Sequence, residues 1–299
     1  MARSSKYGIR ELHKDFPTSK ACLEFIFDSL HKRTCSCGGR YSLRPRRKLF
    51  QCSKCRHQIS PTANTIFNKS STPLTLWFHA LMVFSNAKSG ISGKQLERHL
   101  AVTYKCAWRI LGSIRGALQQ FGRLLKGEVE SDGAYFGGVY NSGKNNEHLS
   151  EAFRAKTVVL GALERGGDVR ATVVPNLSAG TVEGFVVRNV DSSSNTLLLT
   201  DGAKAYTHLG RDYDHHSVDH GKKEYVRGYV HVNSMENFWS HSKRSITGVH
   251  KSISKKHSQS YLNAFVFHYN NRRNDRKRFL TLLDIVLHAA RERKTVISS

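Results

Sequence analysis

The chain has 299 residues, and 39% of them are hydrophobic, which is enough for about two domains with substantial cores. Lys and Arg number 47 against 23 Asp and Glu, and the net charge of +24 is typical of proteins that bind a polyanion. No run approaches the roughly 18 apolar residues of a membrane-spanning helix. Residues 1–8 carry no apolar signal core. We therefore expect a cytoplasmic, nucleoid-associated protein without a membrane partner; a cationic ribosomal protein is the plainer alternative.

Four of the six cysteines form two close pairs that predict a structural zinc site. Cys35 and Cys37 are separated by one residue, Cys52 and Cys55 by two, and 14 residues separate the pairs. Because two residues is the usual spacing, the first pair is irregular, and His57 is an alternative ligand to Cys35. We assign residues 31–66 to a zinc ribbon and residues 1–30 to an N-terminal segment with one helix from residue 17 to 30.

Residues 67–126 have the spacing of apolar side chains expected for helices. A broad apolar face predicts a helix from Leu74 to Phe84, and two further helices, 89–100 and 105–115, flank a short turn. Such a pair predicts a helix-turn-helix that binds DNA, although any three-helix bundle has a similar pattern. The residues expected to face a DNA groove are Lys105, Arg109 and Arg115.

From residue 127 onward the pattern changes to strands alternating with helices. Gly166 and Gly167 predict a hairpin, and residues 141–155 form a polar loop. The predicted strands are 128–135, 156–165, 168–175, 196–200 and an edge strand at 218–227; the predicted helices are 178–190, 203–209, 233–245, 260–273 and 279–291. This order predicts a mixed sheet with helices on its faces, of the ribonuclease-H-like kind. We assign 127–299 to one catalytic domain with C-terminal helices, within an α/β (α+β) multidomain chain.

Three acids on these elements are candidates for a two-metal site. Asp132 lies in the first strand, Asp201 ends the fourth, and 34 residues separate Asp201 from Glu236 in a helix. Magnesium prefers oxygen ligands, and two ions can activate a nucleophile and neutralise a leaving oxygen in phosphodiester transfer. The amide oxygen of Asn233 is a further possible ligand. Each Asp precedes Gly, so either one alone could be only a turn residue.

Other polar residues surround these candidates. Lys243 follows Glu236 by seven residues, on the same helix face, and could hold a phosphate. Glu130 shares a sheet face with Asp132 and could replace or assist it. Further residues expected along the DNA strand are Tyr135, Lys204, His231, Arg244, Lys255 and Lys256.

Six segments together resemble a known family. They are residues 52–67, 90–92, 130–138, 200–206, 231–244 and 269–272. The chain resembles the insertion-sequence DDE transposases with an N-terminal zinc ribbon, the ISXO-type group of bacterial relatives of Merlin elements. The resemblance implies a ribonuclease-H-like core, magnesium (or manganese), binding of terminal inverted repeats, and cleavage followed by strand transfer. Some members use Asn rather than Glu as the third catalytic residue, so Asn233 and Glu236 both stay open.

The leading hypothesis is therefore a DNA transposase that acts on double-stranded DNA, both terminal repeats and target. Pairing two ends would require a homodimer or a higher oligomer. The alternative is a sequence-specific DNA-binding regulator, or a domesticated transposase without strand transfer. A third hypothesis is a resolvase-type nuclease that cuts without joining.

Overall fold

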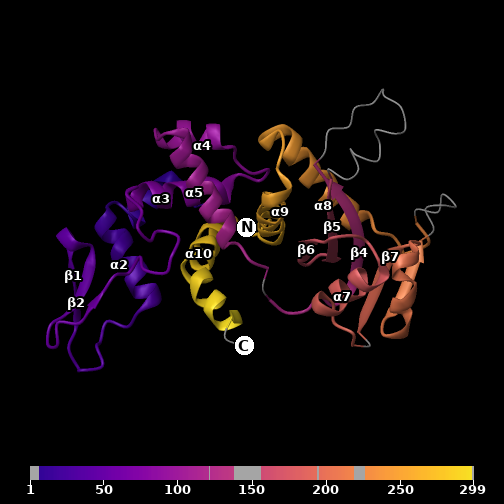
Figure 1. Ribbon diagram of the computed structural model, residues 1–299, viewed down its shortest axis with the longest axis horizontal. Coiled ribbons are helices and arrows are strands. Elements are labelled where there is room, and N and C mark those ends of the chain that lie inside the picture. The colour runs from indigo at the N-terminus through magenta and orange to yellow at the C-terminus, as the bar shows by residue number, and fades with distance from the viewer. Residues whose placement is uncertain (1–6, 121, 138–155, 194, 219–225, 298–299) are drawn as a thin grey trace, which may run out of the picture. The chain divides into compact units, whose positions relative to one another are not determined.

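The computed structural model describes residues 7–120, 122–137, 156–193, 195–218 and 226–297. The chain divides into two compact units, residues 1–119 with 271–299, and residues 120–270. Figure 1 shows the elements of both units. No helix among the described residues is long and apolar enough to cross a membrane.

The first unit begins with two helices and a small sheet. Helices α1 (Ile9–Asp15) and α2 (Ser19–Leu30) replace the single helix expected in residues 1–30. The hydroxyl of Thr18 caps α2 by accepting a hydrogen bond from the Ala21 N–H. Strands β1 (Tyr41–Arg44), β2 (Leu49–Cys52) and β3 (Gln58–Ile59) form an antiparallel sheet, with the 3₁₀ turn η1 (Pro45–Arg47) between β1 and β2.

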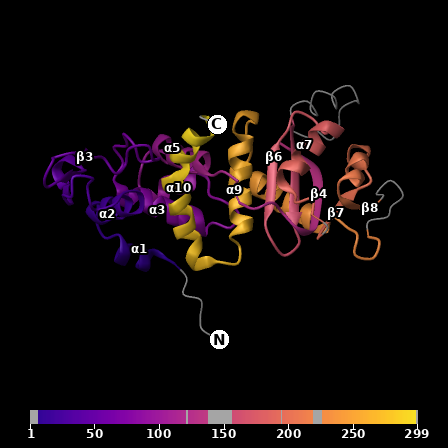
Figure 2. The same ribbon diagram turned by 90° about the horizontal axis from the view of Figure 1, so that it is seen from below.

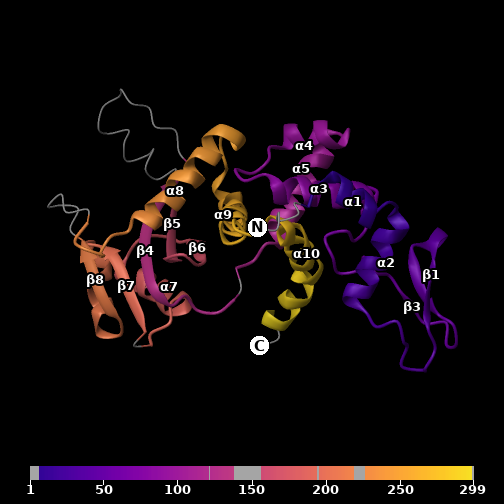
Figure 3. The ribbon, with the colours of Figure 1, turned by 180° about the vertical axis from the view of Figure 1, so that it is seen from behind.

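The rest of the first unit is helical. Helices α3 (Leu74–Asn86), α4 (Gly93–Leu100) and α5 (Tyr104–Ala117) follow the ribbon. The last helix, α10 (Asp275–Ile297), is drawn in yellow in Figures 1 and 3. It contacts α2, α3 and α5. This differs from our assignment of the last helix, 279–291, to the catalytic domain, whereas the helix before it lies in the second unit. The reason is the buried apolar side of α10, which completes the helical core of the first unit.

The second unit is built on a five-stranded mixed sheet with the order β6-β5-β4-β7-β8. Strand β4 is central and pairs antiparallel with β5 and parallel with β7. The strands are β4 (Gly127–Phe136), β5 (Thr157–Glu164), β6 (Val169–Val173), β7 (Thr196–Asp201) and β8 (Asp214–Val218). Strand β8 ends where the expected edge strand 218–227 begins. The sequence pattern did not predict β8 because this strand is polar, and an edge strand needs few apolar side chains.

Helices cover both faces of this sheet. Helices α8 (Asn233–Ser245) and α9 (Ser258–Asn270) share a core with one face, and α7 (Ala179–Asn189) with the 3₁₀ helix η2 (Lys204–Arg211) covers the other. Figure 2 shows α9 beside β6. A π turn, η4 (Ile246–His250), and a 3₁₀ turn, η5 (Lys255–His257), connect α8 to α9. The polar loop expected at 141–155 and residues 219–225 lie outside the described residues.

Candidate active site and metal centre

Asp132 and Asp201 lie side by side on neighbouring strands. In the parallel pair β4–β7, Ser131 stands opposite Thr200, and each Asp is the next residue on its strand. Neighbouring strands lie about 4.8 Å apart, so the two carboxylates leave the same sheet face from adjacent positions. Sequence patterns alone could not predict that these two strands are neighbours, because strand order is a property of the tertiary structure.

The carboxyl group of Asp132 is largely buried and lies near the carboxylates of Asp201 and Glu236. Burial, together with the charges of Asp201 and Glu236, raises the pKa of Asp132 to about 7, against a lowering by the Gly133 N–H. Asp201 and Glu236 are therefore each close enough to Asp132 to interact with it. A bound cation would remove this repulsion.

Helix α8 carries Glu236, whose charge acts on Asp132, and Asn233. Both side chains are exposed in its first turn, and Lys243 is exposed near its end. Gly161, opposite Asp132 on β5, allows α8 to approach, since an added Cβ would lie 2.2 Å from Met235 and 2.7 Å from Trp239.

The four cysteines expected in the ribbon converge on one point. Their sulfur atoms all lie within 4.8 Å of one another, Cys35 and Cys55 are 3.7 Å apart, and Cys37 and Cys52 are 3.4 Å apart. With zinc–sulfur bonds of about 2.3 Å, a tetrahedral site has sulfur–sulfur distances of about 3.8 Å. The quartet thus fits one zinc ion, and the one-residue spacing of Cys35 and Cys37 does not prevent this.

His57 does not take the place of Cys35 in this cluster. Its Nδ1 lies 2.7 Å from the Tyr41 hydroxyl, which donates to the Cys35 sulfur at 3.3 Å. Since that hydroxyl has one proton, Nδ1 of His57 must be the donor to Tyr41. The hydrogen bond from Tyr41, together with hydrogen bonds from Cys37 and Cys55, lowers the pKa of Cys35 to about 5, which favours the thiolate that a metal requires.

Among the described residues, the carboxylate oxygens of the three acids lie farther apart than the sulfur atoms of the four cysteines. The cysteine quartet is the one group of three or more His, Cys, Asp or Glu in the described residues whose ligand atoms all lie within 4.8 Å. A two-metal site separates its ions by about 3.5–4 Å, so its ligands need not surround a single point. The donor set of carboxylates and one amide suits hard cations such as magnesium.

Helices α4 and α5 are joined by a three-residue turn. Ala101 in this turn has a positive φ of 50°, and the hydroxyl of Thr103 caps α5 by accepting from the Cys106 N–H. Lys105 is exposed in the first turn of α5. Arg109 is exposed, but its guanidinium lies 5.4 Å from the Trp77 ring centre and donates to Thr72.

Arg115 does not face outward as expected. It is only 4% exposed, near the end of α5. The sequence period misassigned it because helix α5 is buried nearly all round in its second half, where Leu111, Ile114 and Ala117 are also buried.

The remaining expected DNA contacts lie in the second unit: Lys204, Arg244, Lys255 and Lys256 are exposed, whereas Tyr135 and His231 are half-buried. Lys204 begins η2, three residues after Asp201, and Arg244 follows Lys243 on α8. Lys255 and Lys256 form η5.

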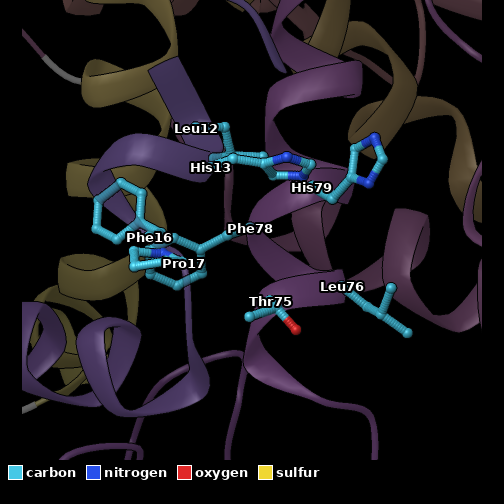
Figure 4. A pocket seen from close by; sticks show the side chains of 8 residues that line it. All are labelled: Leu12, His13, Phe16, Pro17, Thr75, Leu76, Phe78 and His79. Atoms are coloured by element: carbon cyan, nitrogen blue, oxygen red, sulfur yellow. The ribbon is translucent and has the colours of Figure 1, made fainter. Parts of the chain in front are cut away.

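A cavity of about 260 Å³ lies in the first unit, between α1 and α3 (Figure 4). Two histidines, His13 and His79, line it among mostly apolar side chains. Burial lowers the pKa of His79, which disfavours the charged form of the ring. None of the candidate acids lines this cavity.

Comparison with known proteins agrees with the resemblance found in the sequence. Residues 124–270 match the ISXO2-like transposase domain. An uncharacterized protein in transposable element ISH50 of Halobacterium salinarum is 30% identical over 229 residues, covering 72% of this chain and 76% of that protein. The chain belongs to the insertion-sequence DDE transposases with an ISXO2-like domain.

Two solved structures were also matched at low similarity. The Mos1 strand transfer complex is 11% identical, with 72% of this chain and 76% of that chain covered and a TM-score of 0.30. The simian T-cell lymphotropic virus intasome in complex with PP2A regulatory subunit B56 gamma is 12% identical, with 62% and 66% covered and a TM-score of 0.27. TM-scores this low do not establish a common fold.

Proposed function

We propose that this transposase binds the terminal inverted repeats of its element, cleaves DNA at the element ends and joins them to target DNA. The observation that carries the proposal is the placement of Asp132 and Asp201 at adjacent positions of neighbouring parallel strands, with Glu236 near enough to raise the pKa of Asp132. The sheet order, with three antiparallel strands followed by two parallel ones, supports a ribonuclease-H-like core.

Asp132 and Asp201 would hold two magnesium or manganese ions, with Glu236 or Asn233 as the third ligand. Such ions, when bound, activate the attacking water or 3′ hydroxyl and neutralise the charge on the leaving oxygen. The protein fixes its ligands on a strand pair and a helix, which limits reorganisation. Lys243 would contact a neighbouring phosphate as a point charge.

The first unit would supply most of the affinity for DNA. The four-cysteine ribbon, with a structural zinc ion, and the α4–α5 pair would contact the terminal repeats, with Lys105 and Arg109 on α5. Lys204, Arg244, Lys255 and Lys256 would line the strand near the acids. Two ends must be held together for transposition, so we propose at least a homodimer on DNA.

The deciding experiment supplies magnesium, an oligonucleotide that ends in the terminal repeat, and a plasmid target. Asp132→Ala and Asp201→Ala are expected to lower strand transfer by at least about 10³-fold while the affinity for the repeat changes little, because metal ligands act on the reaction more than on binding. Asp214→Ala, at an exposed acid on β8, is the control. Joining by either active-site variant would refute its role.

The same assay separates the alternatives for the whole protein. Binding without cutting would identify a DNA-binding regulator, and cleavage without joining would identify a resolvase-type nuclease.

Glu236→Gln and Asn233→Ala should be measured side by side for the third ligand. The variant that loses more activity at limiting magnesium identifies that ligand, since losing one oxygen donor weakens metal binding. His241→Ala is the control, because His241 is exposed on the same helix but on a different side from Glu236. If both variants lose equally little activity at limiting magnesium, neither residue is the third ligand.

A further inference from the structure

Helix α8 lacks a cap of its own. The residue at its N-cap is Val232, whose side chain has no acceptor, and no side chain within the helix caps it. The first N–H groups of a helix have no partner inside the helix and need an acceptor. The N–H groups that need this acceptor belong to the first turn of α8, which also carries Asn233 and Glu236.

Glu130 supplies this acceptor from another element. Its side chain is fully buried on β4, two residues before Asp132, and its Oε2 accepts a hydrogen bond of 2.9 Å from the Met235 N–H. Met235 is the third residue of α8, which is the position that a side-chain cap normally serves. A negative charge at this end also opposes the positive end of the helix dipole.

Arg165 completes the connection. Its Nε donates to Oε1 of Glu130 at 2.6 Å, and its terminal nitrogens donate to Glu128 and to the backbone oxygen of His231 at 3.0 Å. Arg165 therefore joins β4 to the residue that precedes the N-cap of α8. Arg165 also donates to Nδ1 of His231 at 2.9 Å. The 3.4 Å contact of that nitrogen with Glu130 is therefore no ion pair.

We propose that Glu130 and Arg165 form a positioning clamp that holds the first turn of α8 at a fixed place relative to Asp132. The clamp rests on the proposed function, because it sets the distance between the ligands on β4 and the ligand on α8. Glu130 is itself no ligand: both of its oxygens are used by protein donors and the side chain has no exposure.

A hydrogen-exchange experiment tests the clamp without activity. In protein without added magnesium, Glu130→Gln should speed amide exchange in the first turn of α8 about fivefold, since a helix cap contributes about 1 kcal/mol. Glu128→Gln is the matched control, because Glu128 binds the same arginine from an exposed position on the same strand. Arg165→Lys, which loses the forked contact, should act in the same direction as Glu130→Gln. Unchanged exchange in both Glu130→Gln and Arg165→Lys would overturn the clamp.

A second variant separates positioning from metal ligation. Val232→Thr keeps the shape of Val232 and offers α8 a local cap. Combined with Glu130→Gln, it should restore slow exchange. Glu130→Gln alone should raise the magnesium concentration needed for half-maximal cleavage 10- to 100-fold, the typical effect of losing a residue that supports a ligand. The double variant should reverse this rise.

If exchange is restored but the magnesium requirement is not, Glu130 is a ligand and the positioning role is wrong. If the unmodified protein shows no cleavage at all, the proposed function fails, and the exchange measurement alone still decides whether the clamp exists.

Discussion

Asp132 is the acid whose ionisation is opposed by both burial and neighbouring carboxylates. Its carboxyl group is largely buried, and two more carboxylates lie near it, so its ionised form is disfavoured in the metal-free protein. A carboxylate that serves only as a turn residue would be solvated and would not meet these charges. The raised pKa of about 7 is thus a physical consequence of an arrangement suited to cations.

The raised pKa of Asp132 predicts how stability depends on pH. The pKa in the folded protein, about 7, exceeds the ordinary value of 3.8, so the folded state retains the proton longer than the unfolded state. Stability from this group is complete below pH 4, declines as pH rises from 4 to 7, and is lost above. With about 1.4 kcal/mol for each pKa unit, the whole loss is on the order of 4 kcal/mol.

The measurement is urea unfolding without added magnesium at pH 5 and pH 8, followed by hydrogen exchange in β4. Asp132→Asn should remove most of this pH dependence, whereas Asp214→Asn, at an exposed acid, should preserve it. Magnesium at pH 8 should raise the stability of the unmodified protein but not of Asp132→Asn. A pH dependence that survives Asp132→Asn would contradict the raised pKa.

At the scale of elements, the ribbon has little core of its own. Its buried residues are few, and Phe27 of α2 stacks on Phe50 with ring centres 3.8 Å apart. The helical segment 1–30 and the ribbon 31–66, which we had separated, therefore share a core. Small modules of this kind depend on metal for much of their folding energy.

Removal of metal should unfold the ribbon locally. We expect about one zinc per chain, since four thiolates complete one tetrahedral site. Cys52→Ser should abolish the zinc content and expose β1 and β2 to amide exchange, while β4 and β5 stay protected. Cys106→Ser is the control, because Cys106 lies outside the quartet. Metal analysis that finds no zinc in the unmodified protein would contradict the site.

At the scale of the whole molecule, the chain leaves the first unit, builds the second and returns. Helix α10 packs against α2, α3 and α5, more than 150 residues earlier in the sequence. The first unit is therefore incomplete without α10.

Two leucines of α10 test this arrangement. Leu283 is fully buried and Leu280 is 43% exposed, three residues apart on one helix. Leu283→Ala should destabilise the first unit by about 2–5 kcal/mol, the range for a buried leucine. Leu280→Ala should cost less than about 1 kcal/mol. Hydrogen exchange should locate the loss in α3 and α5 and leave β4 and β7 unchanged; a loss confined to the sheet would return α10 to the catalytic unit.

Local patterns sufficed for most elements because each is set by side chains close in sequence. The expected helix at 233–245 matches α8, and the apolar run at 196–200 matches β7 to within one residue. The polar strand β8 and the burial of Arg115 were missed, because both depend on neighbours that are distant in sequence. Glu130 carried only a weak signal, its shared sheet face with Asp132.

The sequence by itself determined the thiol quartet, the candidate acids, the basic charge and the family, since residue type and spacing carry that information. Only the tertiary structure decided that β4 and β7 are neighbours, that Glu130 caps α8, and that α10 closes the first unit. The reason is physical: strand order, capping between elements and burial arise from contacts between residues that the chain separates by tens to hundreds of positions, and no local pattern encodes which contact is made.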